Sequence, residues 1–348
     1  MRQMTHDWGS GIQQGRRAVT SLNSLKLLSL DPSNRFLCAI LSLFILLLPK
    51  AAFAHDDKPH TFEDLAFTWS FDPLVISVLT ISAVVYALGL RNLWRSGGRG
   101  SGISLYESLA FAAGWIATFF ALVSPLHPWG EVLFSAHMTQ HEILMLVSAP
   151  LFVLGRPFVA ASWALPSMTK RFIVPLSNTR GIKRGWRAIT APFAAWLIHA
   201  IALWVWHIPS LFQATLRSDL VHTLQHASFF LSALLFWWAI IYSRRGAHAY
   251  GAGVLYLFTT SIHSGLLGVF LTLTTRVWYP AYSQTTASWG LTPLEDQQLG
   301  GLIMWVPAGI VYIIAALIMF AAWMRESENG VLRAERERLD RAISDSGV

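Results

Sequence analysis

A succession of long apolar stretches restricts the fold of this 348-residue chain more than any other feature. Each stretch is close to the roughly 20 residues that an α-helix needs to cross a bilayer. Every backbone polar group must find a partner inside lipid, so such stretches form helices. Seven stretches qualify: Pro73–Leu90, Leu105–Val123, His137–Leu154, Ile189–Trp206, His222–Tyr242, Ala252–Thr274 and Leu299–Trp323. The sequence therefore predicts an all-α integral membrane protein, a seven-helix transmembrane bundle that follows an N-terminal signal or leader segment.

Composition supports a membrane protein and argues against a nucleic-acid partner. Hydrophobic residues make up 54% of the chain and charged residues 13%, about half the charged fraction of a typical soluble domain. The chain also holds 16 tryptophans, and tryptophan is enriched at bilayer interfaces. The net charge of +7 resides mainly in short loops between apolar stretches. We therefore expect membrane lipid, and no nucleic acid, around this protein.

The first 54 residues have the pattern of a leader with a signal peptide. A short apolar stretch, Phe36–Leu48, is followed by Ala52-Phe53-Ala54 and then by polar residues. An apolar core before an A-x-A sequence is typical of secretory signals, and the stretch is short for a spanning helix. We expect cleavage after Ala54, with a retained anchor helix as the alternative. Cleavage would also remove Cys38. Because Cys38 is the single cysteine, the chain can form neither an internal disulfide nor a thiolate metal cluster.

The basic residues of the loops predict the orientation of the bundle. Positively charged loops stay in the cytoplasm, and in this chain they alternate with loops that are nearly free of basic residues. Residues 55–71 would form a short external segment, 72–324 the transmembrane domain and 325–348 a cytoplasmic tail. We expect a multi-pass protein of a bacterial plasma membrane with its mature N-terminus outside. The loop residues that carry this prediction are Arg91, Arg95, Arg99, Arg156, Lys170, Arg171, Arg180, Lys183, Arg184, Arg187, Arg244 and Arg245.

An H-x-x-Q-H motif occurs twice, each time near the start of an apolar stretch. Positions i and i+4 of a helix lie on one face, so each motif presents two imidazoles together. Both helices are expected to run from outside to inside, which puts the motifs at the same depth in the outer leaflet. Four imidazoles at one point are what a metal ion or a haem requires of a protein. The motif histidines are His137 and His141, and His222 and His226.

Other polar residues are expected at the same level of the bundle. His127 follows the second apolar stretch, His207 the fourth, and Asp296 precedes the seventh. Polar groups near lipid are costly and usually functional. The predicted metal-binding residues are therefore the four motif histidines together with His127, His207 and Asp296. His199 and His263 are expected deeper in the bundle. Each of them could form a hydrogen bond between helices or an inner step of a metal path.

Four further residues near the motifs are open to two interpretations. Met138, Met145 and Met304 could act as soft copper ligands, although methionine in apolar helices more often packs in the core. Glu142 directly follows a motif histidine and could orient a ligand histidine without binding the metal itself. It could equally turn toward the lipid headgroups.

Three segments of the chain closely resemble the CtaG-type, polytopic cytochrome c oxidase assembly factors. They are His127–Pro157, Trp206–Trp238 and Leu291–Gly309, which contain the two H-x-x-Q-H motifs, a His-x-Pro and a D-Q-Q-x-G-G sequence. The resemblance extends over roughly residues 71–323. It implies a role in maturation of a haem–copper oxidase, with oxidase subunits as partners. The histidines of both motifs, and Asp296, match family positions.

The sequence and the resemblance together favour an assembly or metal-handling factor rather than an enzyme. An imidazole-rich site without cysteine suits Cu(II), or Cu(I) with help from methionine. Copper is therefore the expected metal. A b-type cytochrome with haem, a membrane di-iron oxygenase and a scaffold without metal remain as alternatives. The sequence does not indicate an oligomeric state.

Overall fold

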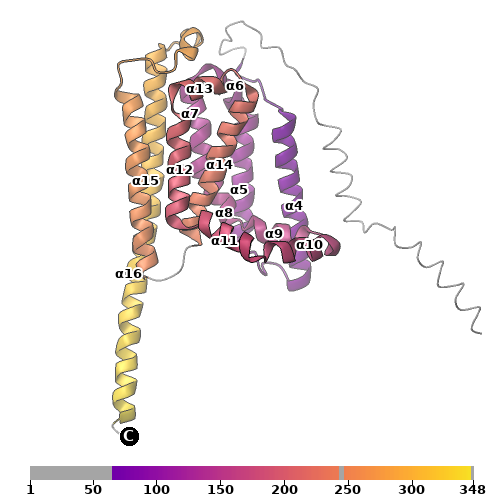
Figure 1. The fold of residues 1–348 in the computed structure, drawn as a ribbon, viewed down its shortest axis with the longest axis vertical. Helices are drawn as coiled ribbons and strands as arrows, with labels where there is room; N and C mark the ends of the chain where they lie inside the picture. The colour runs from indigo at the N-terminus through magenta and orange to yellow at the C-terminus, as the bar shows by residue number, and fades with distance from the viewer. Residues whose placement is uncertain (1–64, 243–246, 346–348) are drawn as a thin grey trace, which may run out of the picture. The chain divides into compact units, whose positions relative to one another are not determined.

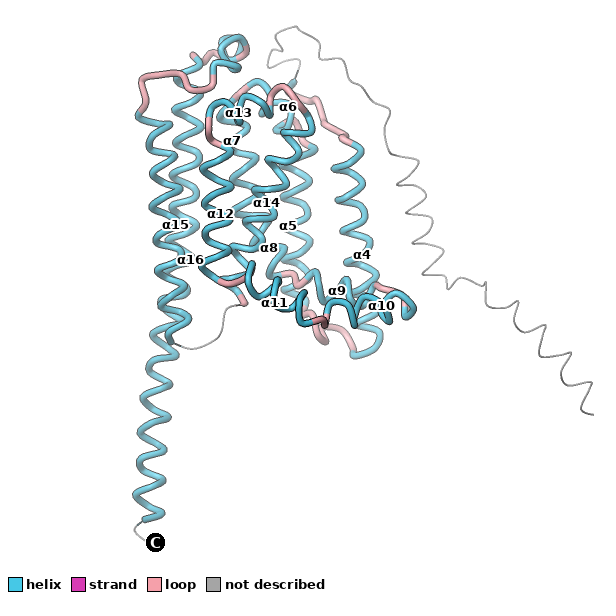
Figure 2. Tube along the Cα trace, in the orientation of Figure 1, coloured by secondary structure: helices cyan, strands magenta, loops and turns pink. Residues whose placement is uncertain are grey.

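The computed structural model describes residues 65–242 and 247–345, and the predicted leader lies outside this part of the chain. The described residues form helices and loops without a strand, as predicted (Figure 2). The helices are α4 (Pro73–Gly97), α5 (Leu105–Val123), α6 (Leu126–Val132), α7 (Phe134–Glu142), the π-helix η2 (Ile143–Ser148), α8 (Ala149–Leu154), α9 (Pro157–Ala164), α10 (Ser167–Ser177), α11 (Arg180–Ile189), α12 (Pro192–Trp206), α13 (Pro209–Thr215), α14 (Asp219–Ile241), α15 (Ala247–Leu273), the 3-10 helices η3 (Pro280–Gln284) and η4 (Thr286–Trp289), and α16 (Pro293–Asp345).

Five of these helices are long and apolar enough to cross a membrane: α4, α5, α14, α15 and α16. Two bent pairs of helices bring the number to as many as seven. The segment Phe134–Leu154 meets α9 at 54°, and α11 meets α12 at 62°. The prediction of several apolar membrane helices is confirmed, with a number between five and seven.

Residues at the helix starts explain where several spans begin. Asp72 accepts hydrogen bonds from the backbone of Leu74 and Val75 and so caps α4. Ser104 and Glu107 form a reciprocal capping box at the start of α5. Each cap satisfies N–H groups that have no partner within the helix, which fixes the first residue of the span.

The helices pack in a chain of neighbours that brings the two H-x-x-Q-H segments together (Figure 1). α14 packs against α8 and η2, which continue α7, and α12 packs against α14 and α15. α5 contacts α8 and η2 on another side, while α4 contacts α9. α16 packs along α15 and also against α7. α7 is therefore enclosed by elements from distant parts of the sequence.

Two glycines allow α16 to approach its neighbours closely. A Cβ on Gly300 would lie 2.3 Å from the ring of Phe134 on α7. A Cβ on Gly301 would lie 2.7 Å from the backbone oxygen of Gly268 on α15. Small residues at such contacts let membrane helices pack backbone to backbone. The G-G of the D-Q-Q-x-G-G sequence therefore holds α16 against both α7 and α15.

The two glutamines of the same sequence tie α16 to the preceding loop. Gln297 accepts a hydrogen bond from the backbone N–H of Trp278 at 2.6 Å and donates to the carbonyl of Arg276 at 3.1 Å. Gln298 donates to the carbonyl of Thr274 at 2.9 Å. These bonds satisfy backbone groups of the segment that follows α15. The connection between α15 and α16 is thus fixed by side chains of α16.

The predicted C-terminal tail continues α16 rather than forming a separate helix. α16 extends without a break from Pro293 to Asp345, a length of 53 residues. At 1.5 Å per residue this is roughly 80 Å, well beyond the ~30 Å core of a bilayer. Its part beyond Arg325 is mostly exposed and extends past the other helices (Figure 1).

Candidate metal centre

The two motifs present their four histidines to a common point inside the bundle. His137 and His141 lie one turn apart on α7, and His222 and His226 lie one turn apart on α14. His137, His141 and His226 are buried, and His222 is partly buried. The i,i+4 spacing aims each pair toward the facing helix, because α14 packs against the continuation of α7.

The four imidazole rings are in direct contact. Ring centroids of His137 and His222 lie 5.1 Å apart, and those of His141 and His226 also lie 5.1 Å apart. Within each motif the two centroids are 4.4 Å apart. Ring nitrogens of His137, His222 and His226 all lie within 4.8 Å of one another. A small movement of these side chains would place three nitrogens around one ion at the ~2 Å expected of metal–imidazole bonds.

Several buried nitrogens in this cluster make no hydrogen bond with the described residues. A buried polar atom without a partner costs about 1–3 kcal/mol, so native structures contain few of them. A neutral imidazole nitrogen without a partner can offer a lone pair to a metal ion or a proton to an acceptor. The atoms are Nδ1 and Nε2 of His141, Nε2 of His207, Nε2 of His222 and Nε2 of His226.

The glutamine of the second motif orients a histidine of the first. His137 Nε2 lies 3.1 Å from Gln225 Oε1, across the interface of the two helices. His137 Nδ1 lies 3.3 Å from the carbonyl oxygen of Gly130 and 3.5 Å from the hydroxyl of Tyr282. The side-chain oxygen of Gln225 and the carbonyl oxygen of Gly130 thus lie on opposite sides of the His137 ring and hold it in one orientation.

The glutamine of the first motif orients the ring of His127 by a hydrogen bond. Gln140 Nε2 donates to His127 Nδ1 at 3.1 Å and to the carbonyl of Ala121 at 2.9 Å. The His127 ring stacks on His222 with centroids 5.5 Å apart. Burial lowers the pKa of His127, so the ring is neutral near pH 7. His127 therefore lies at the edge of the cluster, held by the motif itself.

His207 lies behind two phenylalanines rather than among the four motif rings. Its Nδ1 donates to the carbonyl of Leu203 at 2.7 Å, which leaves a lone pair on Nε2. Burial lowers the pKa of His207 to about 4. Its ring lies 6.4 Å from Phe212 and 6.0 Å from Phe229, and these rings also contact motif histidines. His207 is thus a neutral acceptor adjacent to the cluster.

Asp296 caps α7 instead of joining the imidazoles. Its carboxylate accepts hydrogen bonds from the backbone N–H of Phe134 at 2.7 Å and of Ser135 at 3.1 Å. The hydroxyl of Ser135 donates to the same carboxylate. Both oxygens are occupied at the positive end of the helix, where a negative charge is favourable. The contacts of Asp296 position the first motif and leave no carboxylate oxygen free of a protein donor.

Aromatic residues that the sequence did not single out enclose the cluster. Phe212 lies 5.0 Å from the ring of His137, and Phe229 lies 4.6 Å from that of His141. Burial raises the pKa of Tyr282 well above its usual value, and its hydroxyl donates to the carbonyl of Gly130 at 3.0 Å. Phe229 follows the second motif by one helical turn, which could have revealed it. Phe212 lies on α13 and Tyr282 on η3, and nothing in the sequence of these short helices indicates their role.

The methionines near the motifs belong to the apolar core. Met138, Met145 and Met304 are buried in the largest hydrophobic cluster of the described residues. Glu142 is also buried, and its Oε2 has no hydrogen-bond partner among the described residues. Glu142 therefore does not turn toward exposed surface. The methionine positions fit packing, as expected for this residue type in apolar helices.

His199 and His263, which lie in the described part of the chain, do not join the cluster. His199 Nδ1 lies 3.1 Å from the hydroxyl of Ser232, an interhelical hydrogen bond. The ring of His263 lies 5.3 Å from that of Trp196. The side chain of His248 is outside the described part of the chain. The structural interpretation thus fits His199, and among the described residues the imidazoles that meet are those of the two motifs and of His127.

Curated relatives share most of this chain but are much longer. The uncharacterized proteins Mb0105 of Mycobacterium bovis and MT0111 of Mycobacterium tuberculosis are each 25% identical to it over 289 residues. These matches cover 80% of this chain and 43% of the relatives. The uncharacterized protein ML1998 of Mycobacterium leprae is 25% identical over 281 residues, which cover 77% of this chain and 41% of the relative. The chain thus spans less than half the length of these relatives.

No solved structure matches the chain. The family comparison is more informative, because the model of the cytochrome c oxidase caa3 assembly factors matches residues 84–326. The matched region includes both H-x-x-Q-H motifs, His127, His207 and the D-Q-Q-x-G-G sequence. It also agrees with the resemblance based on those motifs. The chain therefore belongs to the cytochrome c oxidase caa3 assembly factor (Caa3_CtaG) family.

Proposed function

We propose that this protein is an assembly factor that binds copper at the imidazole cluster and supplies it to a maturing haem–copper oxidase. The observation that carries the proposal is the group of buried, unpartnered nitrogens on His141, His222 and His226, beside His137. Family membership supplies the oxidase as the partner. Copper is the cargo in this proposal, so no bond is made or broken other than those to the metal.

The chemistry of the residues present fits a copper ion. The site offers neutral imidazoles and no cysteine among the described residues, which suits Cu(II). The two motif glutamines each hydrogen-bond a ring nitrogen, Gln225 that of His137 and Gln140 that of His127, and such partners set the ring orientation. Burial in an apolar environment strengthens the attraction of ring dipoles for a cation and excludes competing water. The imidazole side chains would thus hold the ion, and the ion would be released when these side chains move apart.

Haem fits the same residues poorly. A haem uses one axial imidazole on each side of its plane. The four rings here are in mutual contact, with centroids from 4.4 to 5.6 Å apart between His137, His141, His222 and His226. A macrocycle would have to separate these helices. A single small ion is therefore the better occupant.

We further propose that each bent pair contributes one span, through its segments Phe134–Leu154 and α12, which gives seven spans. The basic loops place the mature N-terminus outside and the C-terminus in the cytoplasm of a bacterial plasma membrane. The motif ends of α7 and α14 then face the outer side, where copper would arrive and pass to an oxidase subunit.

Metal analysis of purified protein tests the copper proposal. We expect wild-type protein incubated with copper and freed of excess ion to retain the metal. The double variant His137→Ala/His141→Ala should retain little, with its helical content unchanged. His199→Ala is the matched control, since it removes a buried imidazole outside the cluster. Equal copper content in wild type and double variant would leave only the scaffold function.

A further inference from the structure

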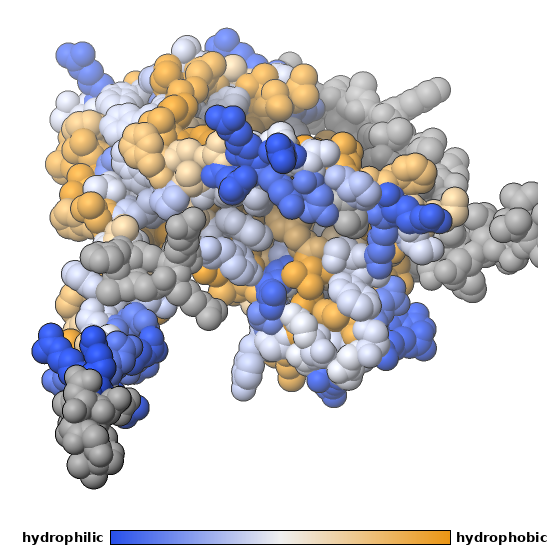
Figure 3. All heavy atoms as spheres, turned by 60° about the horizontal axis from the view of Figure 1, so that its bottom comes forward, coloured by the Kyte–Doolittle hydropathy of each residue, from blue (hydrophilic) through white to orange (hydrophobic). Residues whose placement is uncertain are grey.

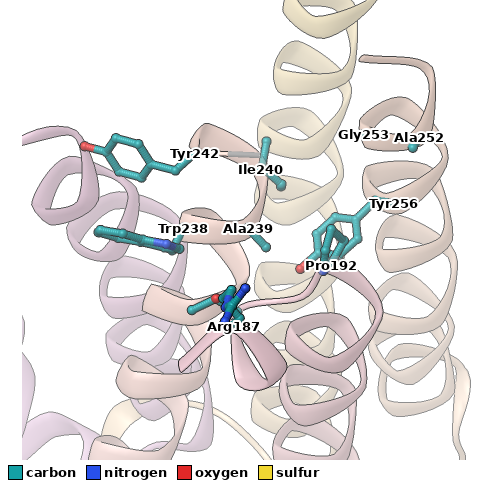
Figure 4. Close-up of a pocket in the computed structure, with 10 residues that line it drawn as sticks. Arg187, Pro192, Trp238, Ala239, Ile240, Tyr242, Ala252, Gly253 and Tyr256 are labelled. Carbon is teal, nitrogen blue, oxygen red and sulfur yellow. The ribbon is translucent and has the colours of Figure 1, made fainter. Parts of the chain in front are cut away.

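A cavity of about 420 Å³ lies at the end of the bundle opposite the motifs (Figure 4). Its volume falls within the range of roughly 300–1,000 Å³ that is typical of small-molecule sites. It opens between the end of α11 and start of α12, the end of α14, and the start of α15. The lining is mostly apolar, and it consists of Arg187, Thr190, Pro192, Trp238, Ala239, Ile240, Tyr242, Ala252, Gly253 and Tyr256.

Among the described residues that line the cavity, Arg187 is the only charged one. Its Nε donates to the carbonyl of Lys183 at 3.2 Å. Among the described residues the single ion pair is that of Arg156 with Glu107 at 3.5 Å, so the Arg187 guanidinium has no acidic partner there. A cation beside an apolar cavity favours a ligand that has both an anionic group and a hydrocarbon part.

The surrounding surface is strongly basic. α11 carries Arg180, Lys183, Arg184 and Arg187 within ten residues, all of them exposed. Figure 3 shows hydrophilic side chains gathered on this end of the molecule. Clusters of basic residues next to membrane helices attract anionic lipid. The charge of the surface is thus complementary to an acidic headgroup.

Aromatic packing holds α11 at the level of the cavity. The ring of Trp186 lies 5.8 Å from Phe158 on α9 and 5.6 Å from Trp238 on α14. Phe158 and Trp238 are themselves 5.6 Å apart. Tryptophan and basic residues on a short helix are typical of a segment that lies in the membrane interface. α11 is therefore held across the end of the bundle, where phospholipid headgroups lie.

We propose that this cavity binds one anionic phospholipid, independently of the copper site. The Arg187 guanidinium would pair with the phosphate, since its planar fork matches two phosphate oxygens. The phosphate would also lie near the first turn of α12, whose free N–H groups favour an anion. Acyl chain would fill the cavity along Ala239, Ile240 and Ala252. The ligand is a lipid rather than free phosphate, because most of the lining is apolar and lies between membrane helices.

Native mass spectrometry of the detergent-purified full chain tests this proposal. The probes are phosphatidylglycerol, phosphatidylcholine and inorganic phosphate, each added separately. We expect wild-type protein to bind phosphatidylglycerol selectively. Arg187→Ala should bind it about fivefold more weakly, the loss expected for one basic contact with an anionic lipid. Arg180→Ala is the matched control, since Arg180 lies on the same helix and does not line the cavity.

Two further variants separate charge from shape. Arg187→Lys keeps the charge without the planar fork and should bind phosphatidylglycerol more tightly than Arg187→Ala does, which would exclude a folding defect at this position. Ala252→Phe fills the cavity and should abolish lipid binding. An equal loss of phosphatidylglycerol binding in Arg187→Ala and Arg180→Ala would show that the lipid is attracted by the overall surface charge. That result would overturn the cavity as a specific site. Binding of phosphate as strong as that of phosphatidylglycerol, or lipid binding unchanged by Ala252→Phe, would overturn the lipid as its ligand.

Discussion

The Oε1 atom of Gln225 in the second motif lies 3.1 Å from His137 Nε2 in the first, so the second motif orients a histidine of the first. The bond joins residues 88 positions apart in the sequence. A motif that is repeated on two facing helices can thus supply ligands on one helix and their orienting partners on the other. The role of the glutamines can therefore be tested by substitution in the same way as that of the histidines.

Replacing Gln225 with Leu should weaken copper binding without removing a ligand. The change frees the His137 ring to rotate, and loss of such a partner typically costs about 10–100-fold in metal affinity. Competition titration with a copper chelator on purified protein measures the change. Gln213→Leu serves as the control, since Gln213 bonds only its own short helix. Unaltered affinity in Gln225→Leu would show that the ring is held by its other contacts.

Asp296→Asn should lower stability and leave copper binding per folded molecule intact. The neutral amide keeps one acceptor oxygen but loses charge-assisted bonds to Phe134 and Ser135, at a cost of about 1–3 kcal/mol. Thermal unfolding in detergent and metal content measured on the same sample separate the two effects. Loss of metal at an unchanged melting temperature would instead make Asp296 a ligand.

Acidification should destabilise the protein partly through His207, which lies just past the end of α12. Burial lowers its pKa to about 4, whereas in the unfolded chain it titrates near 6.5. The unfolded state therefore binds more protons between these values, and stability falls as the pH drops from about 6.5 toward 4. The full effect is roughly 3 kcal/mol. Melting temperature measured against pH should show a shallower decline in His207→Asn, and parallel curves would exclude this residue as a cause.

Gly301→Ala should disrupt the packing of α16. A Cβ at this position would lie 2.7 Å from both the Gly268 carbonyl and the Thr272 backbone N–H, so one of the helices must move. Overpacking of this kind typically costs about 1–3 kcal/mol. Gly309→Ala is the matched control on the same helix, because a Cβ there meets nothing within 4 Å. Unfolding in detergent should separate the two, and equal melting temperatures would contradict the close approach.

A C-terminal alkaline phosphatase fusion should be inactive. The basic loops predict a cytoplasmic C-terminus, and the enzyme folds only after export. A fusion placed after His207 should be active, because this residue is expected at the outer side. High activity of the intact C-terminal fusion would reverse the proposed orientation and put the motifs on the inner side.

The apolar stretches and the motif spacing were sufficient to predict where most spans and the four imidazoles lie. Leu105–Val123 matches α5 residue for residue, since length and hydropathy determine a span almost alone. The role of Asp296 could not be predicted in this way, because it depends on α16 packing against α7. The short helices α9 to α11 were also missed. A search for stretches long enough to cross a bilayer does not detect shorter helices.

The π-helix η2 sets the relative rotation of the two ends of the α7–α8 segment. One additional residue turns everything beyond it by about 100° relative to an uninterrupted α-helix. The histidines of α7 and the residues of α8 that contact α5 and α14 are thus out of phase with a single helical wheel. Shortening Ile143–Ser148 by one residue would give an uninterrupted α-helix. The histidines of α7 could then no longer face α14 while the residues of α8 keep their present contacts with α5 and α14.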